Sequence, residues 1–335
     1  MSNFIYPTHR LSRLRTKENL RKLTRETSLS IRDLIIPLFI IPGTNIQKPI
    51  LSLPGQYQYS IDLLLEKIEL LVHQGVLAVL LFGVPNATKK DPVGSASFSP
   101  DGLVQTALNA IKNKFPELIL ITDICVCSYT LSGHCGILSS DKKTLDNPKT
   151  IELLANMAVS HAEAGADIVA PSAMADGMVF AIRKKLDQAD FYHTGILSYA
   201  VKYASSFYGP FREAANSSPK ENKYLSDRKT YQMDSGNTRE ALKEAYADIQ
   251  EGADMIMVKP ALNYLDIIYQ IKQSFDLPVA AYHVSGEYAM IKAAEEKGWL
   301  NGPEALYESL LSIKRAGADL IITYGFDDIK NMIIY

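Results

Sequence analysis

Short apolar segments alternate along the chain with longer segments in which apolar residues recur at helical spacing. Such runs are typical of strands in a parallel sheet that is covered on both faces. The pattern predicts strands at 35–40, 77–83, 118–126, 167–172, 196–203, 255–260, 278–284 and 320–325. It predicts helices at about 60–74, 101–114, 148–164, 174–188, 239–251, 262–274, 287–297 and 303–316. Eight strand–helix units with right-handed crossovers close into a (β/α)8 TIM barrel of the α/β class.

A short internal repeat supports this count of strands. Residues 165–167, 252–254 and 317–319 each read Gly-Ala-Asp between a predicted helix and a predicted strand, and Gly75 has the same place earlier. Glycine there fits a left-handed cap at the end of a helix. Pro37 conflicts with the first strand because proline lacks an N–H, so we expect the strand to start at Pro37 or to contain a bulge.

Two segments fall outside the alternation. Residues 1–30 mix basic residues with leucines, which predicts an N-terminal arm with some helix, making oligomer contacts outside a barrel domain of residues 31–335. The segment of about 204–237 has no helical pattern at first and follows the fifth strand. Loops of this length are usually functional or disordered, and the aromatic and arginine content favours a lid over the barrel mouth.

The composition is that of an ordinary globular protein. Of 335 residues, 47% are hydrophobic, and the net charge of −2 gives no reason to expect nucleic acid or an anionic membrane surface as a partner. The apolar runs are too short to cross a bilayer, and no signal-peptide core follows the start. Glu18 and Glu26 argue against a transit peptide, so we expect a cytoplasmic protein whose three cysteines form no disulfides.

Two lysines end neighbouring predicted strands. The run Met255-Ile256-Met257-Val258 leads into Lys259, and Lys202 ends the fifth strand in the same way. Active sites of barrel enzymes lie at the carboxyl ends of the strands. A single lysine there more often reaches out into water, but two facing amines lower each other's pKa, which suits nucleophiles toward a carbonyl.

All the cysteines lie within eleven residues, as Cys125, Cys127 and Cys135, after Asp123 on the third strand. Alternation along a strand places Asp123, Cys125 and Cys127 on one face. Three thiolates with one open position form a catalytic type of zinc site, whereas the plainer interpretation is three small buried apolar side chains. Adjacent residues rarely bind the same metal, so we expect His134 to lie beside the metal or at the surface.

Polar residues at the same end of the barrel could hold substrate carboxylates. Arg212 and Arg228 in the long segment can each form two hydrogen bonds with a carboxylate. Ser285, after the seventh strand, and Tyr324, at the end of the eighth, could bind another.

Three longer motifs give a more specific indication. Residues 252–260, continuing Leu262-Asn263-Tyr264-Leu265-Asp266, resemble the Schiff-base lysine signature of the porphobilinogen synthase (5-aminolevulinate dehydratase) family. Residues 198–212, which contain Lys202, resemble its second-lysine segment, and residues 282–287 are also similar. The resemblance extends from Pro7 to Tyr324.

The resemblance implies a homo-octameric barrel enzyme that condenses two 5-aminolevulinate molecules to porphobilinogen, with loss of two waters, in tetrapyrrole (heme) synthesis. Lys202 and Lys259 would each form a Schiff base, with Asp123 as an acid beside the metal-side substrate. Carboxylate binding would fall to Arg212, Arg228, Gln232, Ser285 and Tyr324. The three cysteines match the zinc-dependent branch with one catalytic Zn2+ per site, and Glu244 matches the ligand of an allosteric Mg2+.

Two residues depart from the family pattern, and two other functions stay open. Thr230 replaces a cysteine that pairs in some members with the equivalent of His134, so a second zinc is not expected. Ala173 replaces an acid, so no proton transfer is assigned there. A Schiff-base aldolase would need one lysine and no thiolate zinc, and a silent zinc-binding barrel would need neither lysine. The presence of both Lys202 and Lys259 argues against each.

Overall fold

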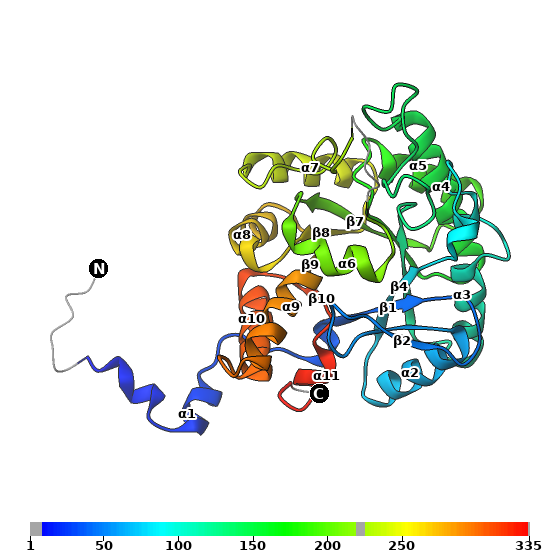
Figure 1. Ribbon diagram of the computed structural model, residues 1–335. Coiled ribbons are helices and arrows are strands. Elements are labelled where there is room, and N and C mark those ends of the chain that lie inside the picture. The colour runs from blue at the N-terminus through cyan, green and yellow to red at the C-terminus, as the bar shows by residue number, and fades with distance from the viewer. Residues whose placement is uncertain (1–8, 219–224, 334–335) are drawn as a thin grey trace.

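The computed structural model describes residues 9–218 and 225–333 of the chain, and its centre is a closed parallel barrel (Figure 1). Eight strands form it, and β10 pairs with β1 to close the circle, with Leu34 opposite Ile321. The strands are β1 (Leu34–Ile40), β4 (Ala78–Gly83), β5 (Ile119–Ile124), β6 (Ile168–Pro171), β7 (Gly195–Lys202), β8 (Met255–Lys259), β9 (Val279–His283) and β10 (Leu320–Thr323). The predicted TIM barrel is therefore confirmed.

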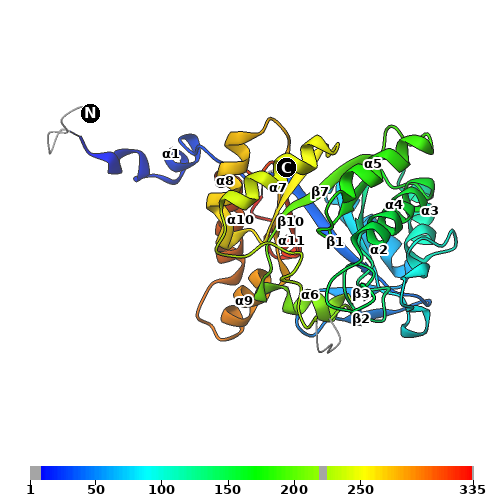
Figure 2. The same ribbon diagram turned by 90° about the horizontal axis from the view of Figure 1, so that it is seen from above.

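Helices surround the barrel, as the view from above shows (Figure 2). They are α2 (Ile61–His73), α3 (Leu103–Lys114), α4 (Asn147–Glu163), α5 (Met178–Gln188), α7 (Arg239–Gln250), α8 (Leu265–Ser274), α9 (Ser285–Glu296) and α10 (Gly302–Ala316). The predicted positions agree apart from a few residues at the ends. For example, α5 begins at Met178 rather than 174, because Gly177 before it is left-handed at φ 77°.

Smaller elements lie outside the eight-stranded barrel. The strands β2 (Gln47–Pro49) and β3 (Tyr57–Tyr59) form an antiparallel pair beside β1, and α11 (Phe326–Ile329) follows β10. The N-terminal segment holds a 3-10 turn at Leu11–Arg15 and α1 (Glu18–Leu23), and it projects away from the barrel (Figures 1 and 2). No helix within the described residues is long and apolar enough to cross a membrane.

The segment predicted as a lid contains more helix than expected. A 3-10 turn at Ser206–Tyr208 leads into α6 (Gly209–Ala214), so the prediction that no helix follows β7 directly was wrong. Pro210 accounts for the start, since proline is favoured in the first turn of a helix. Residues 219–224 of the predicted lid lie outside the described residues.

The expectation for Pro37 was also wrong, because β1 runs unbroken from Leu34 to Ile40 with Pro37 opposite Leu80 of β4. The carbonyl of Ile40 accepts from Val84 on the β4 side, whereas the N–H of Ile41 donates to Tyr59 on the other side. Backbone groups alternate along a strand, so Pro37 faces that second side. There β10 covers only residues 34–35 and β3 only 39–40, so no ladder bond is lost at Pro37.

The Gly-Ala-Asp repeat has a structural cause at the amino-terminal end of the barrel. One carboxylate oxygen of each aspartate accepts the N–H at or near the start of the preceding strand: Asp167 from Leu120 (2.7 Å), Asp254 from Ile196 (2.8 Å) and Asp319 from Val279 (2.8 Å). Each repeat thus ties two adjacent strands together where the barrel begins.

The glycine of the repeat makes room for a cationic side chain. Gly317 caps α10 at φ 118°, as predicted, and a Cβ there would lie 2.9 Å from Cγ of Lys272. The ammonium of Lys272 reaches Asp319 at 2.8 Å, and Lys112 reaches Asp167 in the same way. The lysine stem therefore packs over the glycine while its charge meets the aspartate.

We predict that Asp319→Asn lowers the free energy of unfolding by about 1 kcal/mol, because the amide cannot accept from both Lys272 and Val279 as the carboxylate does. Denaturant unfolding measures the change. Asp276→Asn, an exposed substitution of the same type near the start of β9, is the control and should be neutral. Equal stability of the two variants would contradict this role of the repeat.

Candidate active site

Two buried lysines stand side by side at the carboxyl end of the barrel. Lys202 and Lys259 are the last residues of β7 and β8 and pair directly in the parallel register. Their side chains are 5% and 4% exposed, so neither reaches out into water as a surface lysine does. The structure thus brings the two predicted nucleophiles together.

A bulge in β7 adds an aromatic ring beneath this pair. Between Ser198 and Val201 the register with β8 shifts by one residue, so Tyr199 and Lys202 reach the same side although they are three apart. The ring of Tyr199 lies 5.5 Å from Nζ of Lys202 and 5.0 Å from Nζ of Lys259. Its hydroxyl is buried without a hydrogen-bond partner.

Aromatic rings enclose Lys259 on several sides. Its Nζ lies 4.1 Å from the ring centre of Tyr282, 5.0 Å from Phe211 and 5.3 Å from Tyr208. Burial among these rings and the charge of Lys202 lower the pKa of Lys259 to about 7. A substantial fraction of this amine is therefore neutral and nucleophilic near neutral pH.

Lys202 has a more polar environment than Lys259. Its ammonium donates to the backbone carbonyl of Ser172, and Asp123 lies near both amines. Burial raises the pKa of Asp123 to about 6, although the Ser172 hydroxyl and the two lysines oppose that change. One of its carboxylate oxygens is buried without a partner. Asp123 can therefore hold or release a proton beside the lysines.

The three cysteines form a compact thiol cluster. The sulfur atoms of Cys125, Cys127 and Cys135 lie within 4.8 Å of one another, and all three are free and buried. Hydrogen bonds from the other two thiols hold the pKa of Cys135 well below its usual range. In a tetrahedral zinc site the sulfurs would be ~3.8 Å apart. A small contraction would therefore let this donor set hold a thiophilic dication.

The expected position of the cysteines on the strand was wrong in one respect. Strand β5 ends at Ile124, so Cys125 and Cys127 lie on the turn that follows rather than on an alternating strand face. The N–H groups of Tyr129 and Thr130 both donate to the carbonyl of Val126, and these hydrogen bonds form the turn. The loop holding Cys135 returns to it, and the cluster forms through this turn.

Both ring nitrogens of His134 have partners other than the sulfur atoms. Its Nε2 lies 3.2 Å from the carbonyl of Leu225, which can only accept, so Nε2 carries the hydrogen. Its Nδ1 then accepts from the hydroxyl of Tyr231 at 3.1 Å. With both nitrogens engaged and the ring fully buried, His134 lies beside the cluster and not at the surface.

The predicted carboxylate-binding residues carry unpaired donors. Arg228 donates one terminal nitrogen to Gly133 (3.0 Å) and Ser217 (2.7 Å), which fixes the side chain. The Nε atoms of Arg212 and Arg228 and the amide of Gln232 are buried without partners. Burial, together with the charge of Arg228, lowers the pKa of Arg212. Two guanidinium groups and an amide can therefore receive an anion here.

Ser285 and Tyr324 have partners within the protein. The Ser285 hydroxyl accepts from the N–H of Phe211 (3.0 Å) and faces the carbonyl of Phe207 (3.2 Å). The hydroxyls of Tyr324 and Tyr282 lie 2.9 Å apart, which connects Tyr324 to the ring nearest Lys259. A carboxylate that bound to these two hydroxyls would replace hydrogen bonds that they form within the protein.

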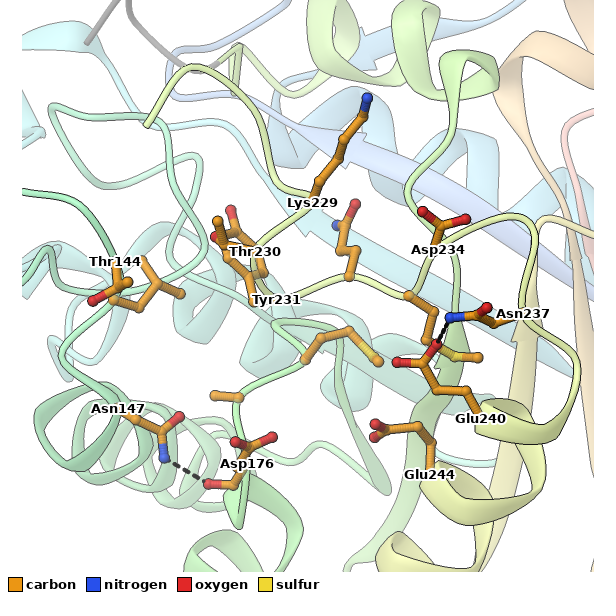
Figure 3. Close-up of a pocket in the computed structure, with 15 residues that line it drawn as sticks. Thr144, Asn147, Asp176, Lys229, Thr230, Tyr231, Asp234, Asn237, Glu240 and Glu244 are labelled. Carbon is orange, nitrogen blue, oxygen red and sulfur yellow. Dashed lines mark hydrogen bonds between the residues drawn. The ribbon is translucent and has the colours of Figure 1, made fainter. Parts of the chain in front are cut away.

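Glu244 lines a separate acidic cavity of about 380 Å³ (Figure 3). Asp176 and Glu240 also line it, and burial and these neighbouring carboxylates raise the pKa of Glu244. Gln232 and the exposed Thr230 form another part of its wall. The cavity therefore borders the segment that carries the carboxylate-binding residues.

Several residues of the site were not found from the sequence. The position of Tyr199 depends on the bulge, and Ser172 acts through its backbone carbonyl, which no side chain reveals. No individual role was predicted for Tyr208 or Tyr282. Ala173, where no proton transfer was expected, is buried. The available signals were the 198–212 and 282–287 motifs, which contain Tyr199, Tyr208 and Tyr282 and resemble the family without an obvious role for each residue.

A barrel with paired strand-end amines of this kind belongs to the enzymes that can use lysine as a nucleophile toward carbonyl compounds. A family model described as delta-aminolevulinic acid dehydratase matches residues 8–332. The chain is a member of that family.

Known relatives agree over almost the full length. The delta-aminolevulinic acid dehydratase of Synechococcus elongatus is 51% identical over 327 residues, 97% of this chain and 98% of that one. The protein of that name in Archaeoglobus fulgidus is 49% identical over 324 residues, with the same shares covered. A crystal structure of the Toxoplasma gondii enzyme, also called porphobilinogen synthase and in complex with the reaction product porphobilinogen, has a TM-score of 0.94 at 41% identity, covering 98% of this chain and 92% of that one.

We predict that imine formation at Lys259 speeds up as pH rises and levels off above about 7, because only the neutral amine attacks a carbonyl. Lys202→Met removes the neighbouring charge and should move this midpoint upward by about one pH unit or more. Borohydride trapping of a bound keto acid at several pH values measures the rate. Lys229→Met, at an exposed position, is the control. An unmoved midpoint in Lys202→Met would show that the two amines do not interact.

Proposed function

We propose that this protein is a porphobilinogen synthase, a hydro-lyase that condenses two 5-aminolevulinate molecules to porphobilinogen with loss of two waters. The observation that carries the proposal is the register pairing of Lys202 with Lys259 in a buried site, within a chain of this family. A Schiff-base aldolase needs only one of these amines, and a non-catalytic barrel needs neither.

Each lysine would hold one substrate molecule. Lys259 attacks the ketone of one molecule, water leaves, and an imine forms within the aromatic surroundings. Ser285 and Tyr324 would bind the carboxylate of this substrate molecule.

The second substrate would bind between Lys202 and the thiol cluster. The unpaired donors of Arg212, Arg228 and Gln232 would hold its carboxylate, and Lys202 would form the second imine. Asp123, with its unpaired oxygen and a pKa of about 6, would move protons beside this substrate. Two imines, one on each strand end, place the reacting carbons of both molecules between β7 and β8.

A zinc ion held by Cys125, Cys127 and Cys135 suits this arrangement. Among the described residues, the three free, buried sulfurs are the only set of three potential ligand atoms within 4.8 Å of one another, and thiolates favour zinc over magnesium. When bound, zinc with an open position supplies Lewis acidity that keeps a substrate amine deprotonated. Asp123, two residues before Cys125, lies near both lysines, so this chemistry would act beside the paired amines.

Purified protein given 5-aminolevulinate should form a pyrrole, detected by a colour reaction. A strong chelator should abolish this activity, and zinc should restore it while magnesium alone should not. Cys127→Ala should lose the metal and the product, yet still trap a keto acid at Lys259, because imine formation there does not require the metal. Full activity of a preparation shown to be free of zinc would contradict this proposal and would indicate that the cysteines only pack in the core.

A magnesium ion at Glu244 would act at a distance from the lysines. The acidic cavity suits a hard cation that keeps several waters, and the cavity wall includes Gln232. We expect magnesium to raise the activity of the zinc-saturated wild type and to have no effect on Glu244→Gln. An equal response to magnesium in both proteins would contradict a magnesium site at Glu244.

The assembly and the cellular location rest on the family resemblance. We propose a cytoplasmic homo-octamer in which the arm of residues 1–30 contacts neighbouring subunits. The exposed Leu11, Leu14 and Leu23 of that arm support this proposal, since an isolated arm would leave them in water.

A further inference from the structure

A buried carboxylate without a cationic partner in the described part of the chain binds the loop that follows Lys259. Glu287 on α9 is 0% exposed, and no lysine or arginine within the described residues pairs with it. Its two oxygens accept from the N–H groups of Leu262 and Val284, each at 2.8 Å. A buried charge satisfied only by backbone donors is costly to place, which calls for an explanation.

One of the donors belongs to the loop that leaves the lysine strand. The N–H of Leu262 lies three residues after Lys259, so Glu287 holds the loop that follows Lys259 and Pro260. The remaining donor, Val284, comes from the end of β9. Glu287 thus holds the loop after β8 in a fixed position relative to the end of the neighbouring strand β9.

The two residues before Glu287 contact the backbone of the segment that carries Phe207 and Phe211. The Ser285 hydroxyl bonds with the backbone of Phe211 and Phe207. A Cβ on Gly286 would lie 2.6–2.9 Å from backbone atoms of Phe207, so only glycine permits this close approach. The tripeptide Ser285-Gly286-Glu287 therefore contacts both the loop after Lys259 and the segment that supplies its aromatic rings.

The aromatic segment is in turn tied to the lysine. The single hydrogen of the Tyr208 hydroxyl is shared between the carbonyls of Tyr203 (2.7 Å) and Lys259 (3.2 Å). Its ring and that of Phe211 face Nζ of Lys259. A shift of the 285–287 tripeptide would consequently move the amine and its surroundings relative to each other.

We infer that Glu287 is a positioning residue for imine formation at Lys259, and that Gly286 serves the same purpose by admitting the Phe207 backbone. The inference rests on the proposed role of Lys259 and adds residues that do not touch the substrate. Lys202 and the thiol cluster have no contact with this tripeptide among the described hydrogen bonds, so their chemistry should be independent of it.

The test compares Glu287→Gln and Gly286→Ala with Glu296→Gln, an exposed substitution of matched chemistry on the same helix. Glutamine keeps one acceptor but turns an NH2 toward backbone donors. Each folded protein is incubated with 4-oxopentanoate, a keto acid that lacks the substrate's amino group, and reduced with borohydride. Peptide mapping then gives the trapping rate at each lysine, and zinc content and thermal unfolding are measured in parallel.

We expect trapping at Lys259 to fall by about 10- to 100-fold in Glu287→Gln and Gly286→Ala, since misplacement by about 1 Å costs that much. Trapping at Lys202, zinc content and the control variant should be unchanged. Unchanged trapping at Lys259, or an equal fall at both lysines, would overturn the inference. If Glu287→Gln does not fold, the Gly286→Ala result decides alone. Absence of trapping at both lysines in the wild type would instead refute the proposed function.

Discussion

Two amines on adjacent strands, both removed from water, cannot comfortably carry two charges. Neighbouring strands are about 4.8 Å apart, and two unit charges at that distance repel by ~3 kcal/mol at an effective dielectric constant of ~20. That energy corresponds to about two pKa units. Burial is the larger cause and lowers the pKa further, whereas Asp123 opposes both, so the pKa of Lys259 is about 7. The closed barrel makes this possible because it fixes both strand ends in register.

The surroundings divide the mouth of the barrel into two halves of different chemistry. Lys259 is enclosed by aromatic rings and has no polar partner for its amine in the described contacts, which favours a neutral nucleophile. The amine of Lys202 instead donates to the backbone carbonyl of Ser172, while Asp123 lies near both lysines. A reaction that joins two copies of one substrate must treat them differently, and this asymmetry supplies the difference.

The sequence was informative where a residue acts through its place on a regular element. Lys202 and Lys259 follow from strand ends, and the Gly-Ala-Asp repeat follows from helix caps. Prediction failed where neighbouring elements decide. Pro37 is tolerated only because no strand bonds β1 on the side that its nitrogen faces, and Tyr199 reaches the lysines only because β7 contains an extra residue. Cys125 and Cys127 converge through a turn whose backbone bonds could not be derived from alternation.

The central claim is that Lys259 is the nucleophile that this environment prepares. The most direct measurement is mass-spectrometric mapping of the protein after borohydride reduction with less than one equivalent of 5-aminolevulinate. The account predicts that the added mass falls on the peptide containing Lys259, and that Lys259→Arg loses both this label and all pyrrole formation, because a guanidinium stays protonated. Labelling confined to other lysines, or an active Lys259→Arg enzyme, would contradict it.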